Sequence, residues 1–113
     1  MAKHKSKRSF YQQSLCESLG EEYSIRNIDF ENCIYRDFGN GFNVEISGTY
    51  TLNVKNPATI YLWLGEEYMV KSVKHVAHPD IKAVVDELYE YSKALVRDGY
   101  TTRDAIFYMK YTK

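Results

Sequence analysis

The sequence predicts one α+β domain: an antiparallel meander sheet of four or five strands, with a short N-terminal helix and a longer C-terminal amphipathic helix packed on it. Apolar and polar residues alternate through the middle of the chain, which is the period of half-buried strands. After Pro79 the apolar spacing changes to three and four residues, the period of a helix that covers one face of a sheet. A length of 113 residues fits a single hydrophobic core.

The chain is predicted to begin with a flexible basic tail over residues 1–8, followed by a single domain over residues 9–113. The tail has no acidic residue and no apolar period, and its cations are Lys3, Lys5, Lys7 and Arg8. These are four of the 15 basic residues, which leaves 11 against 15 acidic residues in the rest of the chain. A basic arm on a mildly acidic body favours contact with nucleic acid or with an acidic protein face.

Ser9 is predicted to cap the first helix, and Gly20 suits the left-handed position that ends it. Between them apolar residues recur every four positions on one face, with a cysteine beside them: Tyr11, Leu15 and Leu19, and Cys16. This helix is short and needs a sheet to pack on.

The first predicted strands follow Gly20. Tyr23 and Ile25 alternate in one phase, and Ile28 and Phe30 continue the strand pattern in the other, which predicts a bulge near Arg26–Asn27. Residues 33–38 then lead into Gly39-Asn40-Gly41, a strong tight-turn signal. After that turn, the inward positions of the next strand are Phe42, Val44 and Ile46.

The later strands are predicted from three further runs. Tyr50, Leu52 and Val54 alternate before Asn56-Pro57 turns the chain. Ile60, Leu62 and Leu64 then form the clearest inward face, with Tyr61 and Trp63 on the opposite side. The sequence Gly65-Glu66-Glu67 predicts a hairpin into a last strand over residues 68–75.

The C-terminal helix is predicted to start at Pro79 and Asp80 and to end at Gly99. Its apolar face consists of residues at spacings of three and four: Ile81, Val84, Val85, Leu88, Ser92 and Leu95. Beyond it, Thr101-x-x-Asp104 resembles a capping box, whereas the aromatic and branched residues 105–111 also suit an edge strand, so helix and strand both stay open for residues 101–111.

The sequence carries no set of residues typical of an enzyme, a cofactor site or a metal site. Serine-nucleophile and phosphate-loop motifs are absent, and the acidic pairs are adjacent in sequence, so that their side chains diverge. His75-x-x-His78 with Cys16 and Cys33 offers four zinc ligands, but the cysteines are too far apart for a finger, and free buried thiols are expected instead. With no apolar run typical of a secretion signal or membrane span, we expect a cytoplasmic protein without membrane contact.

Two surfaces are candidates for binding. The basic tail, with Lys3, Lys5, Lys7 and Arg8, suits phosphate groups, although it equally suits a solubilising start. The second is an aromatic–arginine patch on the polar side of the sheet, formed by Tyr35, Arg36, Tyr61 and Trp63, which are residue types that dominate binding hot spots. If helices cover both faces of the sheet, these side chains belong to the core instead.

Together these features resemble small phage anti-CRISPR proteins that inhibit the guide-RNA-directed nuclease of type II systems. The resemblance rests on three segments: the basic start Met1-Ala2-Lys3-His4-Lys5-Ser6-Lys7-Arg8-Ser9-Phe10, then Tyr35-Arg36-Asp37-Phe38-Gly39, and the amphipathic helix over residues 80–97. It implies a non-enzymatic inhibitor in the host cytoplasm that contacts the nuclease or its guide RNA and acts by occlusion.

The resemblance also assigns roles to parts of this chain. The acidic body, including Glu66 and Glu67, faces the positive nucleic-acid channel of the target, and the basic tail reaches RNA. The chain lacks the large negative charge of a DNA mimic, so the mode of occlusion stays open. The alternative is a small nucleic-acid-binding module that uses residues 1–8.

Overall fold

The computed structural model describes residues 6–102, so Lys3 and Lys5 of the predicted tail and most of segment 101–111 lie outside the described residues. The described part contains five strands, two α-helices and one 3₁₀ turn, in the order α1 (Lys7–Leu19), β1 (Tyr23–Ile28), β2 (Glu31–Asp37), β3 (Phe42–Ser47), β4 (Ala58–Leu64), β5 (Tyr68–Val76), η1 (His78–Asp80) and α2 (Ile81–Arg97).

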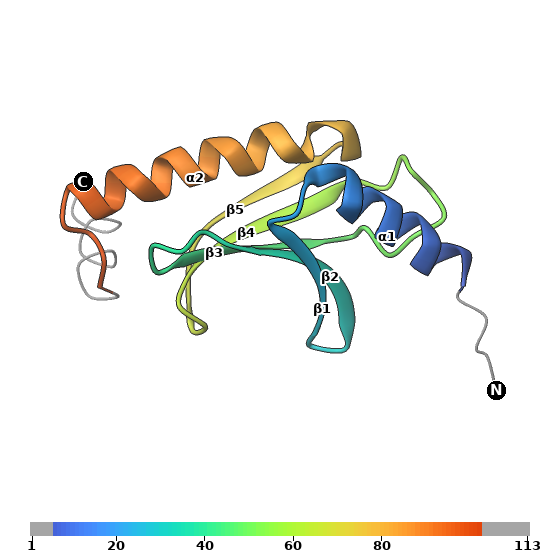
Figure 1. The fold of residues 1–113 in the computed structure, drawn as a ribbon, viewed down its shortest axis with the longest axis horizontal. Helices are drawn as coiled ribbons and strands as arrows, with labels where there is room; N and C mark the ends of the chain where they lie inside the picture. Colours follow the sequence, from blue (N-terminus) through green and yellow to red (C-terminus); the bar gives the residue numbers. More distant parts are fainter. Residues whose placement is uncertain (1–5, 103–113) are drawn as a thin grey trace.

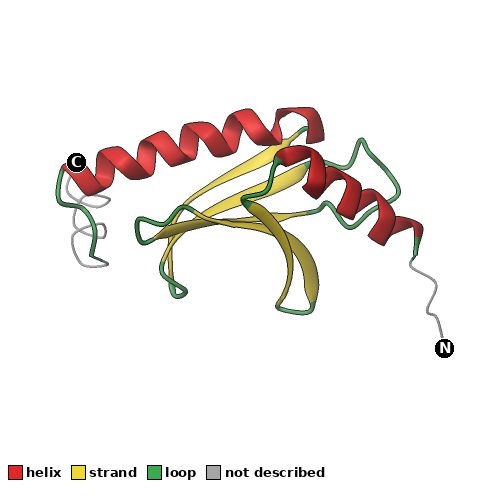
Figure 2. Cartoon of the chain, viewed as in Figure 1, coloured by secondary structure: helices red, strands yellow, loops and turns green. Residues whose placement is uncertain are grey.

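The strands form one antiparallel sheet in the order β1-β2-β3-β4-β5, which confirms the predicted α+β meander with two helices. Both helices lie above the sheet, and the ends of the β1–β2 and β4–β5 hairpins curve away from them (Figure 1). The same arrangement is seen with the elements coloured by type (Figure 2). Within residues 6–102, the sheet therefore has one face covered by helices and one face free of them.

The hydrophobic core fills the space between the sheet and the helices. Phe42, Val44 and Ile46 of β3 are completely buried, as the alternation predicts, and Ile60 and Leu62 of β4 lie beside them. From α2, the buried side chains are Ile81, Val85, Leu88, Ser92 and Leu95. The period change after Pro79 thus correctly predicts both the helix and its buried face.

The first helix begins earlier than predicted. Ser6, not Ser9, is the N-cap: its side-chain oxygen accepts a hydrogen bond from the backbone N–H of Ser9 at 3.1 Å. Lys7 and Arg8 therefore belong to α1 and not to a tail. The helix is fixed to the sheet by buried Gln12, whose amide donates to the carbonyl of Asn32 at 2.6 Å.

The predicted bulge near Arg26–Asn27 is wrong. Strands β1 and β2 pair without interruption from Tyr23 opposite Arg36 to Ile28 opposite Glu31. Because the register is unbroken, Ile25 and Ile28 lie on opposite faces of β1, and the chain then reverses through the two-residue turn Asp29–Phe30, where both residues have positive φ (49° and 66°), as in type I′ turns.

The predicted strand over residues 50–54 is also wrong, because residues 48–57 form a loop. Leu52 and Val54 are 56% and 55% exposed, so their alternation does not face the core. Thr51, Asn53 and Asn56 hydrogen-bond to one another within the loop, which gives the backbone an alternative to strand pairing.

Two further expectations concern the cysteines and the membrane. Cys16 and Cys33 are buried free thiols, as predicted. Within residues 6–102, neither helix is long and apolar enough to span a membrane.

Candidate partner-binding groove

The helix-free face of the sheet carries a continuous row of large polar and aromatic side chains. In the strand register, Tyr35 of β2 lies opposite Glu45 of β3, and Glu45 lies opposite Tyr61 of β4. Asn43 and Trp63 pair in the neighbouring row. Because side chains alternate between the faces of a strand, these residues point away from the buried Val44 and Leu62.

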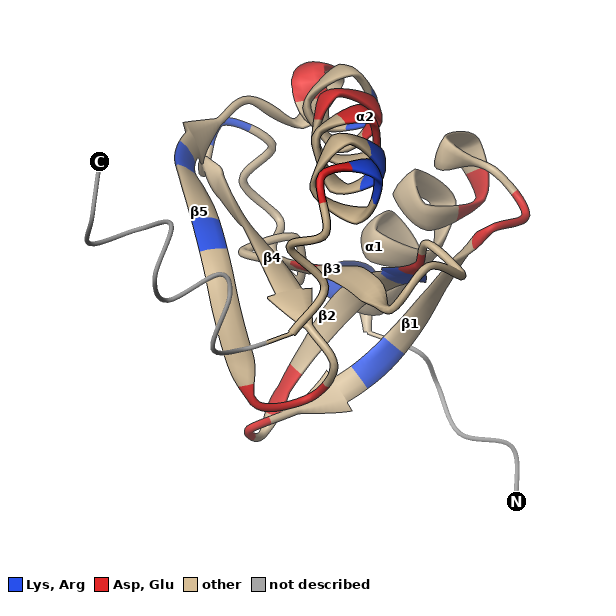
Figure 3. Cartoon of the chain, turned by 90° about the vertical axis from the view of Figure 1, so that its left-hand side faces the viewer, with Lys and Arg blue, Asp and Glu red and all other residues tan. Residues whose placement is uncertain are grey.

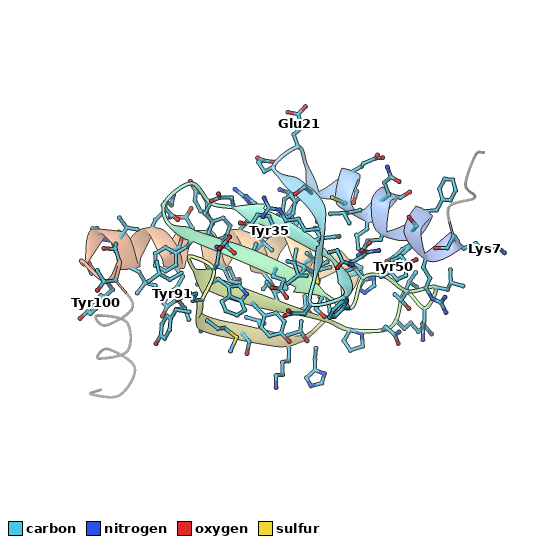
Figure 4. All side chains as sticks on the ribbon, turned by 90° about the horizontal axis from the view of Figure 1, so that it is seen from below. Lys7, Glu21, Tyr35, Tyr50, Tyr91 and Tyr100 are labelled. Carbon is cyan, nitrogen blue, oxygen red and sulfur yellow. The ribbon has the colours of Figure 1, made fainter. Side chains whose placement is uncertain are left out.

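A groove runs along this face. It consists of two adjoining cavities of about 340 and 360 Å³, both lined by Ile28, Asp29, Glu45 and Trp63. The other lining residues that bear on its chemistry are Arg26, Glu31, Tyr35, Asn43, Tyr61, Glu66 and Met69. We call this whole set the groove. Figure 4 looks at the molecule from below and shows Tyr35 over the middle of the sheet.

The structure thus brings together three of the four side chains of the predicted aromatic–arginine patch, namely Tyr35, Tyr61 and Trp63. All three are half-buried, and none belongs to the contiguous hydrophobic core. The alternative in which helices cover both faces of the sheet is therefore wrong for the described residues.

Arg36 does not belong to this patch. It follows Tyr35 directly in β2, so its side chain points to the other face, beneath α2. There its guanidinium carbon lies 5.1 Å from the ring centre of Tyr89 and 5.2 Å from that of Phe38, and Nη1 lies 3.7 Å from Oδ1 of Asp86. Arg36 therefore connects β2 to α2 instead of presenting a charge to a partner.

Arg26 occupies the position in the patch that was expected of Arg36. Its guanidinium carbon lies 3.9 Å above the centre of the Tyr35 ring, a close cation–π contact. The sequence prediction missed Arg26 because a bulge was expected at this residue, and a bulge changes which face a side chain occupies. Burial raises the pKa of the Tyr35 phenol, so the ring carries no charge at neutral pH.

The carboxylates of the groove lack cationic partners. Among the described residues, no ion pair involves Asp29, Glu31, Glu45 or Glu66. Burial raises the pKa of Glu45, and the nearby charges of Asp29 and Glu31 raise it further, while the indole N–H of Trp63 opposes these effects. That indole nitrogen is buried and forms no hydrogen bond of ordinary geometry within residues 6–102, so it acts on Glu45 only as a nearby donor.

The two predicted hairpin acids have different positions. Both are exposed, and both line a cavity with Gly41 and Thr101, but only Glu66 also lines the groove. The turn between β4 and β5 that carries both is acidic and lies at the lower edge of the sheet in Figure 3.

Of the predicted tail cations, the structure describes only Lys7 and Arg8. Both are exposed, and they lie in the first turn of α1, which contains no acidic residue. Figure 4 places Lys7 at one end of the molecule, away from Tyr35. These cations and the groove are therefore separate surfaces.

Phe30 is a candidate contact residue that the sequence prediction missed. Its side chain is fully exposed at the tip of the β1–β2 hairpin, next to Asp29 of the groove. The apolar spacing predicts a strand at Phe30, because Phe30 continues the spacing from Ile28. Asp29 is the residue that indicates a turn at this position, since aspartate favours turns with positive φ.

The four residues considered for zinc binding, Cys16, Cys33, His75 and His78, form no metal site. The described residues contain no group of three or more histidine, cysteine, aspartate or glutamate side chains arranged to hold a metal ion. His78 is buried and its Nδ1 is hydrogen-bonded to the hydroxyl of Tyr11. Burial lowers the pKa of this histidine, so its neutral form is favoured.

Comparison of the chain with protein-family models, with curated proteins and with solved structures found no match.

Proposed function

We propose that this protein is a non-enzymatic binding protein that holds a macromolecular partner on the helix-free face of its sheet. The groove and the adjacent Phe30 form the recognition surface. The observation that carries this proposal is the collection of aromatic rings and unpaired carboxylates on the one face that the core does not use.

The rings on this face support recognition because the fold does not require them. The core between the sheet and the helices is complete without Tyr35, Tyr61 and Trp63. Tyrosine, tryptophan and arginine supply much of the binding energy at protein interfaces, since each covers a large area at a small entropic cost. A fully exposed phenylalanine beside such a surface is costly in water and gains most when a partner covers it.

The more specific form of the proposal is an inhibitor that occludes a host nucleoprotein, such as the guide-RNA-directed nuclease of type II CRISPR systems. It comes from the resemblance in sequence and is supported by the acidic character of the groove, because such nucleases have strongly positive nucleic-acid channels. Glu66 and Asp29, which both line the groove, would face that channel.

A second candidate is a nucleic-acid-binding module. The observation that favours it is the placement of Lys7 and Arg8 in the first turn of α1, where the helix dipole is already positive. Cations there oppose helix stability and strengthen the local attraction for phosphate. In this case, replacing both by glutamine should weaken binding to RNA and reduce its salt dependence.

The proposal is tested with target-DNA cleavage by purified type II nuclease loaded with guide RNA, in the presence of increasing amounts of the full chain. We expect inhibition at stoichiometric amounts, loss of inhibition in Tyr35→Ala and Phe30→Ala, and retention in Phe10→Ala, an exposed ring on α1 that does not line the groove.

Three outcomes separate the alternatives. Full cleavage at excess protein would remove the nuclease from the proposal. Equal inhibition by the groove variants and the Phe10 control would place recognition elsewhere on the molecule. Loss of inhibition only in the Lys7→Gln, Arg8→Gln double variant would favour the nucleic-acid-binding alternative.

A further inference from the structure

We infer that the groove receives a cationic side chain, arginine or lysine, from a basic segment of a protein partner, with Glu45 as the acceptor between the rings of Tyr35 and Tyr61. This inference rests on the proposed function and adds the chemistry of the ligand. Three independent features of the groove lead to it: the position of Glu45, the charge balance and the aromatic walls.

Glu45 lies at the centre of the helix-free face. Its strand, β3, is the middle strand of the sheet, and Tyr35 and Tyr61 are its direct cross-strand neighbours. Cross-strand neighbours lie roughly 5 Å apart at their Cβ atoms, so both rings flank the carboxylate. The side chain is half-buried, lines both cavities, and forms no ion pair with any described residue.

The charge balance of the groove favours a cation. Four carboxylates line it, those of Asp29, Glu31, Glu45 and Glu66, against the single guanidinium of Arg26. Arg26 already stacks on Tyr35, and the carboxylate of Glu31 accepts hydrogen bonds from the Ser47 hydroxyl at 2.9 and 3.0 Å. The raised pKa of Glu45 agrees with a carboxylate that lacks a nearby positive charge. A phosphate group would be repelled here, which argues against nucleic acid as the occupant.

The aromatic walls suit the flat faces of a guanidinium or the methylene groups of a lysine. The stacking of Arg26 on Tyr35 at 3.9 Å shows that this surface accommodates a guanidinium against a ring. Tyr61 and Trp63 extend the aromatic surface on the other side of Glu45.

Trp63 is the only tryptophan in the chain, so its fluorescence reports on the groove directly. The test is a titration of the full chain with a short tri-arginine peptide and with the same peptide in which neutral citrulline replaces each arginine. We expect a saturable change in Trp63 fluorescence with the arginine peptide. With citrulline, and in Glu45→Gln, binding should weaken about tenfold, as expected for loss of one charge-assisted contact.

The control is Glu87→Gln, which removes an exposed carboxylate from α2 outside the groove and should leave the titration unchanged. Equal binding of the two peptides, or equal effects of Glu45→Gln and Glu87→Gln, would overturn the inference. So would a fluorescence change that appears on concentrating the protein alone and disappears in Lys3→Gln, Lys5→Gln, because a second copy of this chain would then be the occupant. If the peptides fail but Tyr35→Ala still abolishes inhibition of the nuclease, the proposed function stands and only the ligand chemistry is wrong.

Discussion

A half-buried carboxylate in the middle strand of a sheet costs stability unless a cation or several donors compensate it. Glu45 is such a residue: Val44 and Ile46 on either side of it in β3 are completely buried against the helices, while Glu45 itself faces the groove. The loss of stability that Glu45 causes is explained if a partner supplies the positive charge that the folded protein lacks next to it. Binding sites commonly retain residues that the folded state alone does not favour.

This cost predicts how stability depends on pH. The pKa of Glu45 in the folded protein lies above its ordinary value of 4.5, so the folded state holds the proton more tightly than the unfolded state. Stability from this group therefore falls as pH rises through the range between the ordinary and the raised pKa. Glu45→Gln should raise the melting temperature at neutral pH, and the gain should vanish below about pH 4, where the glutamate is protonated in both states.

Thermal unfolding of the wild type and Glu45→Gln across this pH range measures the effect, with Glu87→Gln as the control for loss of an exposed acid. A lower melting temperature for Glu45→Gln than for wild type at neutral pH would show that the carboxylate has a stabilising partner after all.

At the scale of elements, the β1–β2 hairpin combines backbone strain with an exposed ring. Phe30 has φ of 66°, a conformation that is unfavourable for side chains with a Cβ atom, and its ring makes no use of the core. Glycine after Asp29 would suit this turn better. Phe30 does not increase the stability of the fold in this strained, exposed position. A role in contacting a partner would explain why a phenylalanine stands beside the groove.

Replacing Phe30 therefore separates stability from binding. Phe30→Gly should stabilise the protein by about 1 kcal/mol, because glycine adopts positive φ without strain. Phe30→Ala removes the same ring but keeps the strain, so it should change the free energy of unfolding little. Both variants should lose inhibition of the nuclease. Denaturant unfolding gives the first quantity; a Phe30→Gly protein no more stable than Phe30→Ala would contradict this account of the turn.

The elements that the sequence predicts correctly are those in which apolar period and burial agree. Strand β3 and helix α2 have uninterrupted patterns, and their predicted inward residues are all buried or half-buried. Residues 50–54 show the same alternation as β3, yet form a loop between β3 and β4, which pair directly with each other; the side-chain oxygens of Thr51 and Asn53 accept hydrogen bonds from backbone N–H groups of this loop. The alternation of apolar residues alone does not reveal whether a segment pairs with a neighbouring strand.

The recognition surface is only partly predictable for a related reason. Tyr35, Tyr61 and Trp63 share a face by simple alternation within their own strands, and the structure places them together on that face. Arg26 and Phe30 depend on the register between β1 and β2, which a two-residue turn sets and a bulge would shift. The alternation also argues against Arg36, which immediately follows Tyr35.

At the scale of the whole molecule, the two candidate binding surfaces are separate. Lys7 and Arg8 lie at the start of α1, and the carboxylates without ion pairs lie in the groove. A nucleoprotein offers both a basic protein channel and nucleic-acid phosphates, so one partner of this kind is able to engage both regions. The groove supplies the aromatic contact area that the α1 cations lack, and we therefore assign recognition to the groove.

Hydrogen exchange of the full chain, measured free and in complex with the guide-loaded nuclease, tests this assignment most directly. The turns that border the groove, residues 29–30 and 65–67, should exchange rapidly in the free protein and markedly more slowly in the complex, while the outer face of α2 stays unchanged. Slower exchange confined to the first turn of α1, with both turns unaffected, would contradict the claim that the helix-free face of the sheet is the binding surface.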